Sequence, residues 1–240
     1  MAQQLSRRLE CVLEFLRPCA VLADVGTDHA LLPVAAVQRG LVERAIAVDL
    51  REAPLVGARA HIEQSGLAGR VITVRGDGLL AVPEGGPEAV VMAGMSGDSM
   101  LRILGAAPHV LCHVTQLILQ PNQNVERLRA WAKASAWHLR EEQMLEERGQ
   151  FFSVCAFVRA AGEDPAYRVP GWTDAALCSV GPWLLARKDP VALRWFERQR
   201  ARASHWAARG VARFRPELEL WEAACRAMRP ATTQGSAPQS

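Results

Sequence analysis

The sequence has 240 residues, of which 50% are hydrophobic and 22% are charged, which is enough for one substantial core and a smaller appendage. No apolar run approaches the roughly 18 residues that cross a bilayer, and charged residues interrupt the N-terminal apolar stretch. The composition therefore excludes a membrane-spanning protein and predicts a soluble, unprocessed one. Six cysteines without a CxxC pair predict reduced thiols and a cytoplasmic location, with no disulfide or metal framework.

In chain order, the sequence alternates apolar runs with segments of helical periodicity. A first amphipathic helix, in which Leu5, Leu9 and Leu16 recur at helical spacing, ends at Pro18. Six predicted strands follow, at residues 20–25, 45–50, 71–74, 89–92, 116–119 and 152–158. Four predicted crossover helices lie at residues 31–39, 54–64, 99–104 and 125–137. This alternation predicts an α/β fold with a doubly wound, Rossmann-like sheet.

The composition changes after residue 160. Residues 160–169 include Gly162, Asp164 and Pro165 and have the character of a linker, and no strand pattern follows them. We therefore predict a Rossmann-like domain at residues 1–160, a smaller helical and basic domain at 161–229, and a disordered polar tail at 230–240.

The first predicted strand runs into a loop at the position where a Rossmann-type sheet binds its nucleotide. The loop reads Asp24-Val25-Gly26-Thr27-Asp28-His29 and has a single glycine, whereas a dinucleotide site needs three to approach a pyrophosphate. Asp28 would repel a pyrophosphate, but it suits a ligand that carries an ammonium and a sulfonium group. The loop therefore favours S-adenosylmethionine over NAD, although an aspartate at a strand end also commonly caps a helix.

Two further acidic residues follow the next two strands. Asp49 ends AIAVDL about 20 residues after the glycine loop, where a carboxylate can accept both ribose hydroxyls. Asp77 precedes Gly78 in VRGDGL, where related methyltransferases contact the adenine edge. Each could be a turn residue, but three carboxylates at successive strand ends favour a cofactor site.

After the fourth strand comes a glycine-rich turn that contains Gly94 and Met95. Enzymes that methylate exocyclic amines usually carry Asn or Asp followed by Pro-Pro here, and C5-pyrimidine enzymes need a cysteine nucleophile. Neither pattern is present. The turn lets the backbone approach a flat base closely, or it is simply a tight turn.

The chain resembles the TrmK family of tRNA (adenine-N1)-methyltransferases. The similarity runs through residues 5–160 and is carried by LSRRL, ADVGTDHALLP, RGDGL, AGMSG and ILQPN. The resemblance implies a Rossmann catalytic domain with a C-terminal helical, coiled-coil-like domain. It also implies S-adenosylmethionine as cofactor and N1 of a tRNA adenine, at position 22, as the methylated atom. Leu31 stands where the family commonly has Tyr, and Ser96 where it usually has Gly, so the cofactor is better defined than the substrate.

On this basis we assign provisional roles to residues of the two loops and the strand ends. The predicted cofactor-binding residues are Asp24, Gly26, Thr27, Asp49, Asp77 and Gly78. The predicted catalytic residues are Asp28, His29, Gly94 and Met95. Asp28 is the candidate for steadying the adenine amine or easing loss of its proton, because the methylated ring is positively charged.

Positive charge is concentrated in the C-terminal segment. Between Arg187 and Arg215, nine basic residues face only Asp189 and Glu197. If residues 191–214 form one helix, six basic residues fall within an arc of about 100°. They are Arg194, Arg198, Arg202, His205, Arg209 and Arg213. This stripe predicts contact with tRNA phosphates, the alternative being a solvated helix face.

Two alternatives stay open at this point. One is a methyltransferase for another substrate, such as a small molecule or ribosomal RNA. The other is a noncatalytic RNA-binding protein that keeps the fold, against which the intact Asp24, Asp49 and Asp77 argue. We expect a monomer that binds tRNA and needs neither a metal ion nor a membrane.

Overall fold

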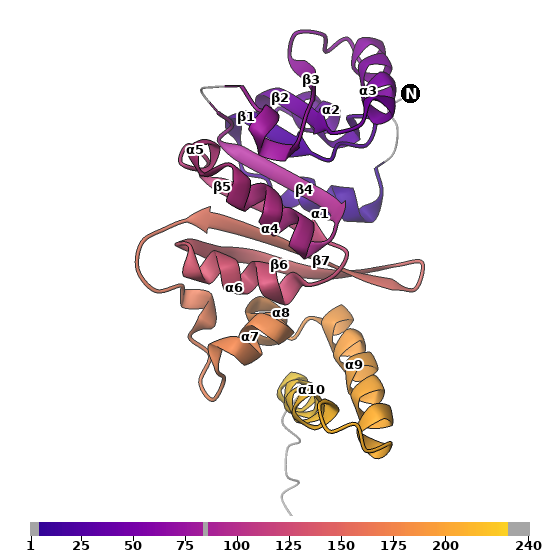
Figure 1. Ribbon diagram of the computed structural model, residues 1–240, viewed down its shortest axis with the longest axis vertical. Helices are drawn as coiled ribbons and strands as arrows, with labels where there is room; N and C mark the ends of the chain where they lie inside the picture. Colours follow the sequence, from indigo (N-terminus) through magenta and orange to yellow (C-terminus); the bar gives the residue numbers. More distant parts are fainter. Residues whose placement is uncertain (1–4, 84–85, 230–240) are drawn as a thin grey trace, which may run out of the picture.

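A computed structural model describes residues 5–83 and 86–229 of the chain, so the predicted tail at 230–240 lies outside the described residues. Its centre is a seven-stranded sheet in the order β3-β2-β1-β4-β5-β7-β6 (Figure 1). The strands are β1 (Cys19–Val25), β2 (Val42–Asp49), β3 (Val71–Arg75), β4 (Ala89–Met95), β5 (Gln116–Pro121), β6 (Trp137–Glu147) and β7 (Gln150–Arg159). The first five strands are parallel, and β7 pairs antiparallel with β5 and β6. The predicted doubly wound α/β sheet is confirmed.

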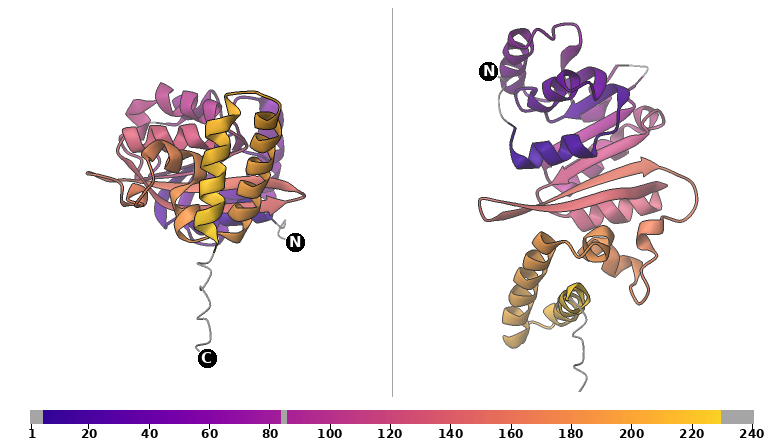
Figure 2. Two further views of the ribbon diagram at one scale, coloured as in Figure 1. Left: turned by 90° about the horizontal axis from the view of Figure 1, so that it is seen from below. Right: turned by 180° about the vertical axis from the view of Figure 1, so that it is seen from behind.

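Helices cover both faces of this sheet (Figures 1 and 2). One apolar core joins the sheet to α1 (Arg7–Phe15), α2 (Leu31–Gln38) and α3 (Glu52–Gln64). The other core joins it to η1 (Gly78–Ala81), α4 (Gly97–Ala106), α5 (Pro108–Leu111) and α6 (Val125–Ala134). Because β1 lies between β2 and β4, the chain reverses its winding direction there. Ligands of open α/β sheets bind at the carboxyl ends of the strands beside such a point.

The last two strands form a long hairpin that the sequence predicted only in part. The helix expected at 125–137 ends at Ala134, and β6 begins at Trp137 after Ala136 adopts a left-handed φ of 55°. Arg148 and Gly149, with φ of 52° and 76°, form the two-residue turn that fits the right-handed twist of the paired strands.

Four helices and a short helical turn continue beyond the β6 edge of the sheet (Figure 1). They are η2 (Pro165–Tyr167), α7 (Asp174–Val180), α8 (Pro182–Ala186), α9 (Pro190–Ala208) and α10 (Phe214–Met228). Their buried residues share one apolar cluster with the sheet, and α9 packs beside α10 (Figure 2, left). The domain boundary near residue 160 stays a prediction.

The helix predicted at 191–214 is shorter than expected. α9 ends at Ala208, and Gly210 follows with a φ of 80°, a left-handed conformation that closes helices and favours glycine. Pro216 stands in the first turn of α10, where its missing N–H costs no hydrogen bond. Arg213 therefore lies outside α9, and the basic stripe is interrupted.

Two kinds of feature are absent from the described part of the chain. None of its helices combines the length and the apolar character needed to cross a bilayer. Nor do its His, Cys, Asp and Glu side chains gather in any group of three that could hold a metal ion.

Candidate active site

The loop after β1 lies at the point where the winding reverses. The N–H groups of Gly26 and Thr27 donate to the Val48 carbonyl at 2.8 and 3.0 Å, which ties the loop to β2. Gly26 has a φ of 80°, a conformation that side chains disfavour. The hydroxyl of Thr27 is buried near the Asp24 carboxyl group, whose pKa it lowers, although no hydrogen bond of regular geometry joins the two.

Asp24 is buried at the end of β1, with 5% of its surface exposed. Burial raises the pKa of its carboxyl group to about 6, and the nearby charges of Asp28 and Asp49 add to the rise. A positively charged ligand beside Asp24 would reverse this effect, because it stabilises the ionised carboxylate.

Asp49 ends β2 and is also buried. Its Oδ1 atom accepts hydrogen bonds from the Arg51 backbone N–H at 2.8 Å and from Arg51 Nε at 3.4 Å. These bonds fix the Asp49 carboxylate at the carboxyl ends of the parallel strands. Leu50, directly after it, is 61% exposed and offers an apolar surface beside the carboxylate.

Asp77 follows β3 and forms a two-pronged pair with Arg102 of α4, at 3.1 and 3.2 Å. The hydrogen bonds from Arg102 lower the pKa of the Asp77 carboxyl group. Gly78 begins η1 with a φ of 58°, and a Cβ atom there would lie 2.8 Å from Ile103. Close packing against Ile103 is therefore a second reason why a glycine stands at position 78.

Residues 28–30 connect the loop to α2 through an uncommon backbone conformation. His29 and Ala30 have φ of 52° and 50°, which costs free energy in residues with a side chain. Asp28 is 82% exposed, and His29 Nε2 lies 3.6 Å from its Oδ1 atom. The imidazole ring lies against Gly57 of α3, where a Cβ atom would be 2.1 Å from Nδ1.

The turn predicted at Gly94 and Met95 is the end of β4, which is held by Gln120 in β5 and by Asn122 directly after β5. The Gly94 N–H donates to the fully buried Gln120 at 3.1 Å, and Asn122 Nδ2 donates to the Gly94 carbonyl at 2.7 Å. A Cβ atom on Gly26 would lie 2.7 Å from the Met95 methyl carbon. The loops after β1 and β4 therefore face each other across the crevice.

Between these loops lies a cavity of about 380 Å³, which we call the catalytic cavity. It is lined by Arg8, Leu9, Asp24, Gly26, Asp28, Leu31, Leu32, Ala93, Gly94 and Asn122. The structure thus brings together Asp24, Gly26, Asp28 and Gly94, while Asp49 and Asp77 stand at the neighbouring strand ends. Sequence reasoning gave no role to Arg8 or Asn122, although both lie in motifs that carry the family resemblance.

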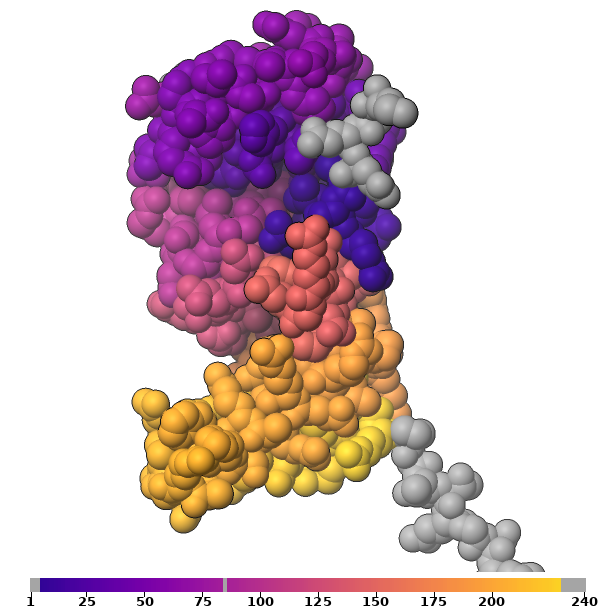
Figure 3. All heavy atoms as spheres, turned by 90° about the vertical axis from the view of Figure 1, so that its right-hand side faces the viewer, coloured from indigo at the N-terminus to yellow at the C-terminus, as the bar shows by residue number. Residues whose placement is uncertain are grey.

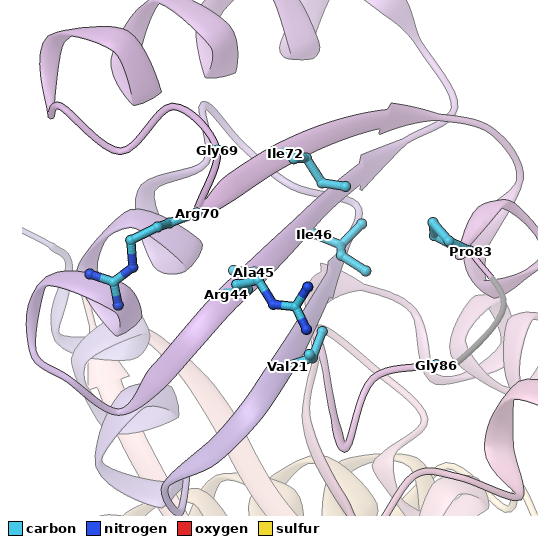
Figure 4. A pocket seen from close by; sticks show the side chains of 9 residues that line it. All are labelled: Val21, Arg44, Ala45, Ile46, Gly69, Arg70, Ile72, Pro83 and Gly86. Atoms are coloured by element: carbon cyan, nitrogen blue, oxygen red, sulfur yellow. The ribbon is translucent and has the colours of Figure 1, made fainter.

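A second hollow, of about 250 Å³, lies on the sheet toward the other end of the strands (Figure 4). Val21, Ile46 and Ile72 form an apolar floor, and Arg44 and Arg70 stand at its side. No carboxylate, thiol or histidine lines it among the described residues, so it offers no acid–base or nucleophilic chemistry.

The basic residues of α9 are partly neutralised by carboxylates from other elements. Arg194 pairs with Glu146 of β6 at 2.8 Å, and Arg202 pairs with Glu217 of α10. Arg209 hydrogen-bonds to His205 at the helix end. Arg198, by contrast, has no ion-pair partner among the described residues, and its guanidinium donates to the Gly149 carbonyl at 3.4 Å.

Fold and site together define a methyltransferase of the Rossmann type. Residues 5–155 match the family described as "Methyltransferase domain". The tRNA (adenine(22)-N(1))-methyltransferase of Bacillus subtilis (strain 168) is 36% identical over 191 residues, which cover 80% of this chain and 79% of that protein.

Solved structures agree with these sequence matches. The B. subtilis m1A22 tRNA methyltransferase TrmK superposes with a TM-score of 0.81 at 31% identity, covering 94% of this chain and 97% of that one. A Streptococcus pneumoniae protein in complex with S-adenosyl-L-methionine superposes with a TM-score of 0.83 at 27% identity, covering 92% and 100%. The chain belongs to the TrmK family of tRNA (adenine-N1)-methyltransferases.

Proposed function

We propose that this protein transfers the methyl group of S-adenosylmethionine to N1 of adenine 22 in tRNA. The observation that carries the proposal is the pairing of the two loops across the catalytic cavity. The acidic Asp24–Asp28 segment lies on one side, and the Gly94–Met95 end of β4 lies on the other. Both loops stand at the carboxyl ends of β1 and β4, where an open α/β sheet binds its ligand.

The residues present fit S-adenosylmethionine. The buried Thr27 hydroxyl lies near Asp24 without a hydrogen bond of regular geometry among the described residues, and Gly26 lacks the Cβ atom that would collide with Met95. Asp24 and Asp28 suit a cationic ligand. Asp49 would accept the ribose hydroxyls. Asp77, held by Arg102, and the backbone of Gly78 would face the adenine edge, while the exposed Leu50 would cover the adenine ring.

When bound, the cofactor supplies a methyl group on a sulfonium, which the neutral N1 lone pair of adenine can attack without prior loss of a proton. Positioning by the protein therefore carries most of the rate. Gly94 and Met95, fixed through Gln120 and Asn122, would form the wall against which the flat base lies. Because N1 lies on the Watson–Crick edge, a paired adenine must be extruded, which costs a few kcal/mol.

The charge that develops on the methylated ring gives Asp28 a role. Its exposed carboxylate lines the cavity, so it can hold the exocyclic amine or accept its proton. His29, whose Nε2 atom lies 3.6 Å from Asp28 Oδ1, would orient Asp28.

Arginines of α9 would hold the tRNA by its phosphates. The ion pairs of Arg194 and Arg202 reduce their free charge, so Arg198 would contribute most, with His205, Arg209 and Arg213 at the far end. Deleting the gene and measuring tRNA nucleosides by mass spectrometry tests the function. We expect 1-methyladenosine to be lost from tRNA, and an unchanged level would contradict the proposal.

A further inference from the structure

The catalytic cavity adjoins a larger groove, which we call the hairpin groove. It has a volume of about 740 Å³, and it shares Arg8 and Asn122 with the catalytic cavity. From there it passes Phe151 and Phe152, beside the turn of the β6–β7 hairpin, and reaches Trp195 and Arg198 of α9. In Figure 3 the hairpin tip, in salmon, stands between α1 in indigo and α9 in orange. The groove thus leads from the methyl-transfer site to the C-terminal helices.

The lining of the hairpin groove combines aromatic rings with arginines. The Arg8 guanidinium lies 5.1 Å from the centroid of the Phe152 ring, and that of Arg198 lies 6.0 Å from the Phe151 ring. The Nε atom of Arg8 is buried without a hydrogen-bond partner among the described residues. No Asp or Glu side chain belongs to the described lining. Flat guanidinium groups and aromatic rings without competing carboxylates are the surface on which unpaired RNA bases stack.

We propose that the hairpin groove binds the RNA strand beside the target adenine. Arg8 and Phe152 would offer a stacking surface for a neighbouring unpaired base, and Arg198 would contact its phosphate. The proposal rests on the proposed function, since it names the surface that presents the substrate strand to the catalytic cavity. This RNA-binding surface differs from the predicted basic stripe along α9. Its contacts come from α1, the β6–β7 hairpin and only one side of α9.

The test compares two groove variants with a matched control. Arg198→Gln removes the unpaired charge, and Phe152→Leu removes the ring but keeps an apolar side chain in β7. Arg44→Gln serves as the control, because Arg44 is exposed and lies beside the hollow of Figure 4. Binding of unmodified tRNA is measured over a range of salt concentrations, S-adenosylmethionine binding by calorimetry, and methyl transfer at varied tRNA concentration.

We expect Arg198→Gln to reduce the salt slope of tRNA binding by roughly 0.7 to 0.9, the effect of one lost phosphate contact. Phe152→Leu should weaken tRNA binding about fivefold or more, as loss of one stacked base does. Both variants should keep the affinity for S-adenosylmethionine, which also shows that they are folded, and Arg44→Gln should behave as wild type. Wild-type tRNA affinity and salt slope in both groove variants would overturn the proposal.

The outcomes separate this proposal from the proposed function. A wild-type protein that binds tRNA but methylates no adenine N1 contradicts the proposed function, while the affinities of the variants still decide on the groove. A protein that methylates tRNA at N1 but whose groove variants bind normally keeps the function and loses the groove. A wild-type protein that does not bind tRNA overturns both.

Discussion

Arg129 of α6 and Glu142 of β6 form a fully buried ion pair, with Arg129 Nε donating to Glu142 Oε1 at 2.6 Å. Arg129 Nη1 also donates to the Cys178 carbonyl of α7, at 2.6 Å. Gly181, which precedes α8, packs against this ion pair so closely that a Cβ atom would lie 2.7 Å from Glu142 Oε2. This pair therefore joins the sheet to the first of the C-terminal helices.

Breaking the Arg129–Glu142 pair should destabilise the whole chain. Arg129→Met leaves a buried carboxylate without its partner, so the free energy of unfolding in urea should fall by about 3 to 5 kcal/mol. Replacing both residues, with Glu142→Leu as the second change, should cost less than the single change. The exposed Arg226–Glu222 pair, with 3.9 Å between charged atoms, is the control, and Arg226→Met should change stability by less than about 1 kcal/mol. Equal losses at the two sites would disprove this role.

The Arg129–Glu142 pair also shows why part of the fold could not be predicted. Residues 137–147 read WHLREEQMLEE, with Glu, Gln, Leu and Met that favour helices and no β-branched residue. The tertiary partners on α6 and β7 make this segment a strand, and those partners are distant in sequence. Gly210, by contrast, is a stop signal visible in the sequence, and the helix predicted at 191–214 runs through it.

For the candidate site, the strand-end residues that line the cavity could be predicted from the sequence, but the lining residues from other elements could not. Asp24, Asp28 and Gly94 could be placed together because parallel strands end at one edge of the sheet. Arg8 lines the cavity from α1. Because it lies on a helix, its position could not be predicted from where the parallel strands end. Likewise Glu146 and Glu217, which neutralise arginines of α9, lie on other elements, so the helix face alone suggested more free charge than the structure has.

The raised pKa of Asp24 predicts a pH-dependent cofactor affinity. A cationic ligand binds the ionised carboxylate better, so S-adenosylmethionine affinity should fall by up to about tenfold per pH unit below the pKa of about 6. Above that pH the affinity should level off. Asp24→Asn should bind weakly at every pH without this dependence, as calorimetry between pH 5 and pH 8 would show. The same pH profile in Asp24→Asn would assign the effect to another group.

The raised pKa of Asp24 also predicts how the stability of the ligand-free protein depends on pH. The folded-state pKa lies above the ordinary value of 3.8, so the folded chain keeps a proton that the unfolded chain loses between about pH 4 and pH 6. Ionisation of Asp24 therefore lowers stability as the pH rises through this window, by about 3 kcal/mol in total. Relative to wild type, Asp24→Asn should gain stability from pH 4 to pH 7 in urea unfolding. A constant difference would refute the shift.

Asp49→Ala should weaken S-adenosylmethionine binding by about 1.5 to 3 kcal/mol, the range for hydrogen bonds to a charged group. The carboxylate is fixed by Arg51, so it can accept two ribose hydroxyls without reordering. Glu52→Ala, an exposed residue at the start of α3, is the control and should bind normally. Calorimetry that finds unchanged affinity in folded Asp49→Ala would remove this residue from the site.

Asp28→Asn should lower turnover by roughly 10²-fold or more, the scale of losing a positioned acid–base group, with little change in tRNA affinity. His29→Asn is the companion variant, because asparagine tolerates the left-handed backbone at this position. It should have a smaller effect, since His29 acts through Asp28. Single-turnover kinetics would measure both, and a normal rate in Asp28→Asn would exclude the carboxylate from the chemistry.

The most direct test of the account is methyl transfer in vitro. Purified protein is incubated with S-adenosylmethionine labelled in its methyl group and unmodified tRNA, and the RNA is then digested and its nucleosides identified. A tRNA with guanosine in place of adenine 22 serves as the matched substrate control. We expect label in 1-methyladenosine with the natural tRNA and none with the substituted one. Label in another nucleoside, equal labelling of both tRNAs, or no label in correctly folded tRNA would contradict it.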